Sequence, residues 1–298
     1  MRLGVNVPNF GPGTGPESLV GWVRFAEDAG FSLAMMSDHV AVTPDVAELY
    51  PPPFYDPFTT LAWLAGLTER LELGTTVTIL PYRHPLLTAR VAANIDDLSG
   101  GRFVLGVGVG WSAQEYAALG VPFERRGAIT DEYLAAITAL WSTDLTSYEG
   151  MLVSFGDVHG PRPAHRPHPP VWVGGASRSA LRRAVTFGDA WHPNNAELGW
   201  LRTEGVPTLR SLAAEAGRPV PALCPRMRLR LTDTPWDEDG RRAGEGHLDQ
   251  VLGDLDGLAS LGADVVVLDT NPDHPSQRRP ADEDWRMLET VAARVTAA

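Results

Sequence analysis

A histidine and an aspartate stand directly after an apolar stretch near the N-terminus, where a strand is expected to end. Asp38 and His39 follow the apolar run 33–36. An imidazole titrates near neutral pH, so His39 at the end of a strand can donate or accept a proton during a reaction. We interpret His39 as the candidate catalytic residue. The alternative is a structural histidine held in a loop by hydrogen bonds.

A glycine-rich turn forms a second candidate site. Gly174-Gly175-Ala176-Ser177 is followed by Arg178 and by two more arginines at positions 182 and 183. Two glycines let the backbone approach a ligand closely, and Ser177 can cap a helix whose first N–H groups bind an anion. The motif predicts a phosphate site, while an ordinary strand-to-helix turn with solvated arginines would have the same sequence.

Other apolar runs also end in polar or glycine-rich residues, which suggests a common rim. We expect Trp111, in one of these glycine-rich turns, to face a ligand. The histidines show neither the H-x-H nor the H-E-x-x-H spacing, so we predict no metal site. The rim residues outside the two sites above are Thr75, Thr76, Val77, Gly108, Gly110 and Trp111.

Strand-like and helix-like patterns alternate from end to end. In one helix-like segment Leu87, Val91, Ile95 and Leu98 recur on one face, after Pro85 at the first turn. Eight strands with helices between them favour a closed (β/α)8 barrel, whose active site lies at the C-terminal ends of the strands. The predicted strands are Leu3–Val7, Leu33–Met36, Leu71–Ile79, Phe103–Val107, Val171–Val173, Ala190–His192, Met227–Leu231 and Asp264–Leu268.

The alternative fold is an open doubly wound sheet. Such a sheet would normally carry G-x-G-x-x-G after its first strand, and residues 6–16 lack that pattern. Nothing in the composition breaks the chain, so we predict one domain over residues 1–298. Val40–Asp56 is a long loop of the kind that forms functional lids, and Tyr148–Val158 suggests an inserted β-hairpin. Three helix-to-strand joints are expected to use a left-handed glycine, at Gly30, Gly188 and Gly262.

Composition excludes several classes of protein. The net charge of −12 argues against nucleic acid and anionic membranes as partners. All 25 basic residues are arginines, so a Schiff-base lysine or a P-loop lysine is impossible. The single cysteine, the absence of a signal-peptide pattern and the absence of a long apolar run predict a cytoplasmic protein.

The sequence resembles the luciferase-like flavin and deazaflavin oxidoreductases, particularly their coenzyme F420-dependent branch. The similar stretches cover nearly the whole chain in the expected order. Each stretch alone is a weak match to the family, and together they are a strong one. They are residues 37–39, 73–77, 84–87, 97–102, 105–111 with 115–116, 119–123, 126–127 with 131–132, 170–175 and 188–193.

The resemblance implies a luciferase-like TIM barrel with an isoalloxazine-like ring across its mouth. It implies a non-proline cis peptide at Thr76-Val77 beneath that ring, and a phosphate end resting near Ser177. The carboxylates of an F420 tail would meet Arg178 and its neighbours, and relatives of this kind are often homodimers. The cofactor-binding residues are then Asp38, Thr75, Thr76, Val77, Gly108, Gly110, Trp111, Gly174, Gly175, Ala176, Ser177 and Arg178, with His39 catalytic.

Three functions follow as hypotheses. The first is an F420-dependent oxidoreductase that moves a hydride between the deazaflavin and a small organic substrate. The second is an FMN-dependent monooxygenase, which would need a reductase and dioxygen. The third is a paralogue that binds a flavin or deazaflavin without catalysis. Some F420 relatives carry a glutamate where this chain has Trp111, and Glu115 stands four residues later.

Overall fold

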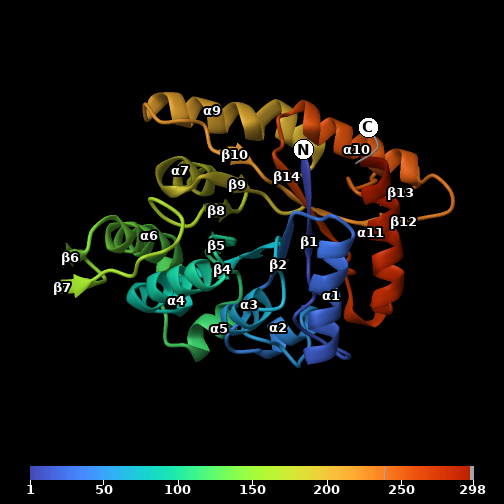
Figure 1. Cartoon of the computed structure of the whole chain (residues 1–298). Helices are drawn as coiled ribbons and strands as arrows, with labels where there is room; N and C mark the ends of the chain where they lie inside the picture. Colours follow the sequence, from blue (N-terminus) through green and yellow to red (C-terminus); the bar gives the residue numbers. More distant parts are fainter. Residues whose placement is uncertain (238, 296–298) are drawn as a thin grey trace.

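The computed structural model describes residues 1–237 and 239–295, in which parallel strands and helices alternate around a barrel (Figure 1). Neighbouring strands run in the order β10-β9-β8-β5-β3-β2-β1-β14-β11. The wall consists of β1 (Arg2–Asn6), β2 (Leu33–Met36), β3 (Glu72–Thr75) continued by β4 (Thr78–Ile79), β5 (Phe103–Gly108), β8 (Val171–Gly174), β9 (Ala190–His192), β10 (Ala222–Leu223) continued by β11 (Arg226–Arg228), and β14 (Val265–Asp269).

The two ends of this sheet meet at the seventh strand. Pro225 lies between β10 and β11, so β10 pairs with β9 and β11 pairs with β14. Parallel bridges join Asn194 to Arg226 and Leu223 to Ala263 across the gap. The amide of Arg226 donates to Pro193 O at 2.9 Å. These bridges close the sheet, and the predicted (β/α)8 barrel is confirmed.

Helices cover the outside of the barrel, and several begin at a proline, whose fixed φ suits the first helical position. The barrel helices are α1 (Pro16–Asp28), α3 (Pro57–Ala65), α4 (Pro85–Leu98), α6 (Arg126–Ser142), α7 (Arg178–Phe187), α9 (Val206–Glu215), α10 (Leu248–Ser260) and α11 (Ala281–Val295). Shorter turns of helix are α2 (Pro44–Leu49), α5 (Ala113–Ala118), α8 (Leu198–Trp200), the π turn Leu201–Gly205, and 3₁₀ turns at Leu80–Tyr82, Phe123–Arg125 and Pro275–Gln277.

The helix α4 forms where the apolar spacing predicted it, but only part of that apolar face is buried. Leu87 is 53% exposed and Leu98 is 71% exposed, whereas Ala89, Ala92 and Ala93 are buried. Small alanine side chains let the helix approach the barrel closely, and this contact determines its orientation. Of the four residues on the apolar face noted in the sequence, Ile95 is buried and Val91 is partly buried, while Leu87 and Leu98 are exposed.

Smaller features follow the expectations with one exception. The predicted hairpin is β6 (Leu145–Glu149) with β7 (Ser154–His159), and it projects from the barrel beside α6 (Figure 1). The loop after β11 contains the short parallel pair β12 (Arg230–Leu231) and β13 (Glu245–Gly246). Gly30 and Gly262 adopt left-handed φ of +80° and +87°. Gly188 is extended, with φ −94° and ψ 147°, because the chain enters β9 directly, so that prediction was wrong.

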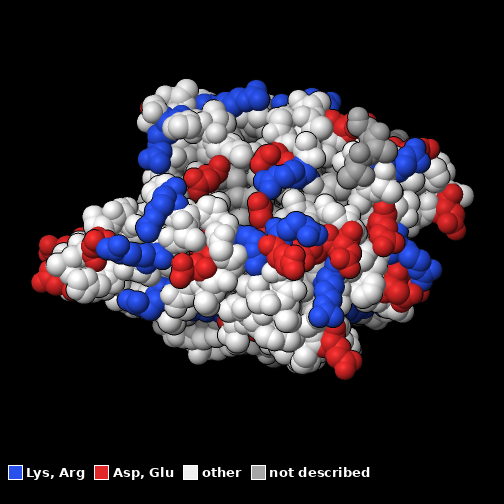
Figure 2. Space-filling view, in the orientation of Figure 1, with Lys and Arg blue, Asp and Glu red and all other residues white. Residues whose placement is uncertain are grey.

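Figure 2 shows how charges are distributed on one face of the molecule. On the face drawn in Figure 2, arginine and acidic side chains lie interspersed over most of the elements. Within residues 1–237 and 239–295, no helix is both long and apolar enough to cross a membrane.

The close packing of the wall makes a direct stability prediction. A methyl group added at Gly106 on β5 would lie 1.8 Å from the carbonyl oxygen of Thr75, so the backbone would have to move. We expect Gly106→Ala to lower the free energy of unfolding by about 3 kcal/mol, measured by urea denaturation. The matched control is Gly253→Ala on α10, where the methyl group meets nothing within 4 Å. The free energy of unfolding of that control should rise by about 1 kcal/mol. A Gly106→Ala variant as stable as the wild-type protein would contradict the packing described here.

Candidate active site

A cavity of about 260 Å³ opens at the C-terminal ends of the barrel strands, and we call it the redox cavity. Most of the residues predicted from the sequence line it. They are Asp38, His39, Thr76, Val77, Gly108, Gly110, Trp111, Gly174 and Gly175, joined by Ser37, Tyr50, Ile79, Val109, Asn194 and Arg226.

The turn at Thr76 and Val77 is tied to the opposite side of the barrel. Its peptide bond is cis, as the resemblance implied. Arg226 on β11 donates from Nη1 to the Thr76 carbonyl oxygen at 3.1 Å. Asp269 on β14 accepts from Nε and Nη2 of the same arginine, at 3.0 and 2.6 Å. Arg226 and Asp269 thus join the third, seventh and eighth strands of the barrel.

His192 on β9 holds the same turn from another side. Burial lowers the pKa of His192 to about 4, so its ring is neutral. Its Nδ1 lies 2.5 Å from the carbonyl oxygen of Cys224, which can only accept. The proton is therefore on Nδ1, and Nε2 accepts from the Thr76 hydroxyl at 2.9 Å.

The glycines of the rim make room for hydrophobic side chains from this turn. A methyl group at Gly108 would lie 2.5 Å from Cγ2 of Val77, and one at Gly174 would lie 3.1 Å from its Cγ1. At Gly110 the methyl group would lie 2.7 Å from Ile79. Val77 therefore occupies the space between two glycine-bearing strands and forms part of the cavity wall.

His39 pairs with a glutamate that the sequence did not assign to the site. Nδ1 of His39 lies 2.6 Å from Oε2 of Glu115, whose side chain is fully buried. The other oxygen, Oε1, accepts from the amides of Val40 and Ala41 at 2.7 and 3.0 Å. Ser112 caps the short helix α5 and so places Glu115 one turn away from Trp111.

This pairing determines which nitrogen of His39 is available. An ionised carboxylate only accepts hydrogen bonds, so Nδ1 carries a proton and Nε2 remains for a ligand. Burial alone would raise the pKa of Glu115, but hydrogen bonds from His39, Ala41 and Val40 outweigh burial and place that pKa below its usual value. Glu115 is therefore an anion that orients the imidazole.

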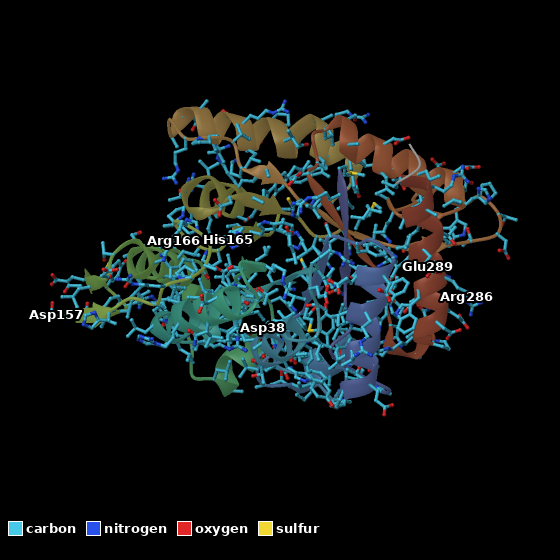
Figure 3. The ribbon with its side chains drawn as sticks, viewed as in Figure 1. Asp38, Asp157, His165, Arg166, Arg286 and Glu289 are labelled. Carbon is cyan, nitrogen blue, oxygen red and sulfur yellow. The ribbon has the colours of Figure 1, made fainter. Side chains whose placement is uncertain are left out.

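Asp38 lines the redox cavity, but its carboxylate is occupied by protein groups. Arg83 contacts both oxygens, with Nη1 at 2.6 Å and Nη2 at 2.9 Å, and the amide of Ile79 donates at 3.0 Å. Arg83 also binds Asp56 at 2.7 Å. Asp38, labelled in Figure 3, thus anchors β4 and the end of the lid loop. The oxygens of the Asp38 carboxylate are thus bonded to protein groups, and whether Asp38 contacts a cofactor stays a prediction.

Four predicted residues are not among those that line the cavity. Thr75 is buried and donates its hydroxyl to the Gly106 carbonyl at 2.7 Å, which is a structural bond. Ser177 caps α7 as expected, accepting from the Ala180 amide at 3.2 Å. Ala176, Ser177 and Arg178 are exposed at the rim, where a longer ligand could reach them.

One arginine of the expected anion site is already paired. Arg183 is buried and donates to Asp131 at 2.6 Å and to the carbonyl of Gly127 at 3.2 Å. Arg178 and Arg182 are exposed and form no ion pair within the described chain. These two arginines remain for an anionic ligand.

The loop between β2 and α3 covers His39 with aromatic rings. The centroids of Tyr50 and Phe54 lie 5.2 and 5.5 Å from that of His39. Trp111 lies 5.9 Å away on another side. Asp45 on α2 accepts from the Ser112 hydroxyl at 2.7 Å and so connects the loop to the start of α5. The predicted lid therefore lies over the histidine and limits the access of water to it.

Two other titratable groups, His165 and Cys224, do not line the redox cavity. His165, in the segment between β7 and β8, lies 2.7 Å from Asp96 and comes from a different part of the ribbon than Asp38 (Figure 3). Burial raises the pKa of Cys224 to about 12, so its thiol is a poor nucleophile. Over residues 1–237 and 239–295, no three His, Cys, Asp or Glu side chains gather where they could hold a metal ion.

The buried carboxylate of Glu115 makes a pH-dependent prediction. Its pKa lies below the ordinary 4.5 in the folded state, so its stabilising effect is present above pH 4.5 and is lost as the pH falls through the folded pKa. At pH 7, Glu115→Gln should lower the free energy of unfolding by about 2 kcal/mol. That deficit should be smaller at about pH 3.5, below the ordinary pKa of 4.5, because the carboxylate in the unfolded wild-type chain then binds a proton more readily than the same carboxylate in the folded protein.

Urea denaturation at both pH values measures this difference. The control is Glu124→Gln, at an exposed glutamate with no ion pair in the described residues. It should leave stability unchanged at both values. If Glu115→Gln lowered the free energy of unfolding equally at both pH values, the charge of Glu115 would be unimportant for stability.

Comparison with known proteins agrees with this geometry. A family model described as luciferase-like monooxygenase matches residues 1–236. An uncharacterised protein of Mycobacterium bovis is 37% identical over 172 residues, which cover 55% of this chain and 57% of that protein. The FMNH2-dependent dimethylsulfone monooxygenase of Pseudomonas putida is 31% identical over 161 residues, which cover 53% of this chain and 44% of that enzyme.

Two solved structures share the fold. The monooxygenase RslO1 of Streptomyces bottropensis superposes with a TM-score of 0.81 at 21% identity, covering 98% of each chain. An F420-dependent secondary alcohol dehydrogenase, solved with an F420–acetone adduct, gives 0.78 at 15% identity, covering 97% of each chain. Because the family model spans most of the sequence and the barrel has the same architecture, the chain belongs to the luciferase-like monooxygenase family.

Proposed function

We propose that this chain is an oxidoreductase that binds coenzyme F420 at the redox cavity and exchanges a hydride with a small organic substrate beside His39. The observation that carries this proposal is the buried pair of His39 and Glu115. It leaves one imidazole nitrogen for a ligand at the edge of a cavity lined by backbone and by Val77.

The residues present fit a flat, anionic cofactor. The wall around Val77 is bordered by Gly108 and Gly174, so no side chain from those positions projects over it. The capped N-terminus of α7 and the exposed Arg178 and Arg182 suit a phosphate and the carboxylates of a tail. When bound, F420 would supply the hydride chemistry at this wall.

The chain's own residues would then perform three tasks. His39 would donate or accept a proton at Nε2, with Glu115 holding the ring in orientation. Tyr50 and the other lid aromatics would exclude water from the reacting atoms. Trp111, which is 44% exposed and lines the cavity, would face the substrate or the cofactor ring.

The alternative cofactor is FMN, which would make the chain a monooxygenase that needs a reductase and dioxygen. The FMNH2-dependent relative from Pseudomonas putida favours this alternative. The exposed arginines at the start of α7 favour F420, because its tail carries several carboxylates in addition to the phosphate. A paralogue that binds a flavin without catalysis is a third candidate, which the pairing of His39 with Glu115 disfavours.

Cofactor binding tests the proposal directly. Titration of the apoprotein with oxidised F420, followed by quenching of cofactor fluorescence, should give a dissociation constant well below about 100 µM. FMN should bind more weakly. Arg178→Gln should weaken F420 binding roughly ten-fold, since it removes a charge-assisted contact to the tail.

Arg202→Gln is the matched control, because Arg202 is exposed on the π turn after α8 and forms no ion pair in the described chain. It should leave F420 affinity unchanged. Preference for FMN would favour the monooxygenase instead. If neither cofactor bound below about 100 µM, the enzymatic proposal would be wrong.

A further inference from the structure

A second polar cavity, of about 170 Å³, lies at the same end of the barrel between β11 and the segment after β14. We call it the arginine cavity. Three arginines contribute to its wall, together with amide and hydroxyl groups. Its lining residues are Arg228, Leu229, Arg230, Glu245, Thr270, Asn271, Pro272, Asp273, Gln277 and Arg279.

The carboxylates in this wall are already paired, mostly with an arginine from outside it. Arg242 contacts both oxygens of Glu245, at 3.1 and 3.2 Å, and Asp273 at 2.6 Å. Arg228 contacts Asp273 as well. Arg230 forms no ion pair within the described residues, and its guanidinium lies over the ring of Trp236, 5.1 Å from the centroid. Arg279 is paired with Asp284 at 3.1 Å, so four arginines meet three carboxylates around this cavity and the local charge is positive, in a chain whose net charge is −12.

The wall also contains a donor that no protein atom uses. Nε of Arg228 is buried without a hydrogen-bond partner. A buried donor without a partner is unfavourable, and an anion in the adjoining cavity would compensate for it if the side chain turned slightly. Positive charge and unused hydrogen-bonding capacity together indicate an anionic ligand.

Residues of one short strand, β11, line both the redox cavity and the arginine cavity. Arg226 lines the redox cavity and Arg228 lines the arginine cavity. A smaller space of about 90 Å³ is lined by both of these arginines and by Asn195. Residues two apart on a strand point to the same side, so Arg226 and Arg228 share one side of β11.

We propose that the arginine cavity binds a carboxylate or phosphate group of the substrate, whose other end reacts beside His39. This inference rests on the function proposed above for the redox cavity. The anionic end of the cofactor is proposed to lie at the start of α7, after β8, and β9 lies between β8 and the seventh strand. The arginine cavity is therefore left for the substrate, and the substrate is an organic anion.

Anion binding to the apoprotein tests the site without any cofactor. Inorganic phosphate and acetate are titrated separately by calorimetry at constant ionic strength, in an Arg178→Gln background that removes the α7 site. One of these probes should bind, and adding Arg230→Gln should weaken that binding roughly ten-fold. Arg210→Gln, at an exposed arginine on α9, is the matched control and should have no effect. The probe that binds identifies phosphate or carboxylate chemistry.

Two results would overturn the proposal. The first is that neither anion binds, or that Arg230→Gln leaves binding unchanged. The second is that Arg230→Gln alone weakens F420 affinity as much as Arg178→Gln does, which would assign the cavity to the cofactor tail. Failure of F420 and FMN to bind at all would instead refute the proposed function, and the calorimetry on the apoprotein distinguishes that case.

Discussion

The bond from Arg226 to the Thr76 carbonyl is the contact on which the barrel mouth depends. It links the turn after β3 to Asp269 at the end of β14, and His192 holds the same threonine from β9. Val77 then projects between β5 and β8, where only glycine leaves enough space. The shape of the cavity wall therefore follows from a few long-range polar contacts and from the absence of two side chains.

Charge compensation explains how several acids lie buried at one end of an acidic protein. Asp38 is paired with Arg83, Asp269 with Arg226, and Glu115 with His39. A buried carboxylate without a partner would be strongly unfavourable, whereas each of these is bound by a cation, by a ring N–H or by backbone amides. Of the three pairs, only that of Glu115 with His39 includes an imidazole, whose second ring nitrogen is left for a ligand. This difference separates the proposed catalytic pair from the two structural ones.

Much of the fold was predictable, because alternating strand and helix patterns are local properties of the sequence. The face of α4 was not predictable, because the burial of Ala89 and the exposure of Leu98 depend on how closely that helix approaches the barrel. The conformation of Gly188 was missed for a similar reason, since the chain enters β9 without a left-handed turn.

The site was predictable where single residues follow strands, and it was missed where distant residues pair. His39 and the glycine turns were identified from position alone. Glu115 was set aside because of its spacing from Trp111, although a separation of 76 positions from His39 in the sequence says nothing about their distance in space. The contact of Arg83 with Asp38 could not be read from the sequence either, and it gives that aspartate a structural role.

A crystal structure of the protein soaked with F420 tests the central claim most directly. The account predicts electron density for the deazaflavin ring against Val77, between Gly108 and Gly174, with Nε2 of His39 facing the reacting edge. Density for the ring outside the redox cavity, or a His39 ring turned away from Glu115 in the complex, would contradict it.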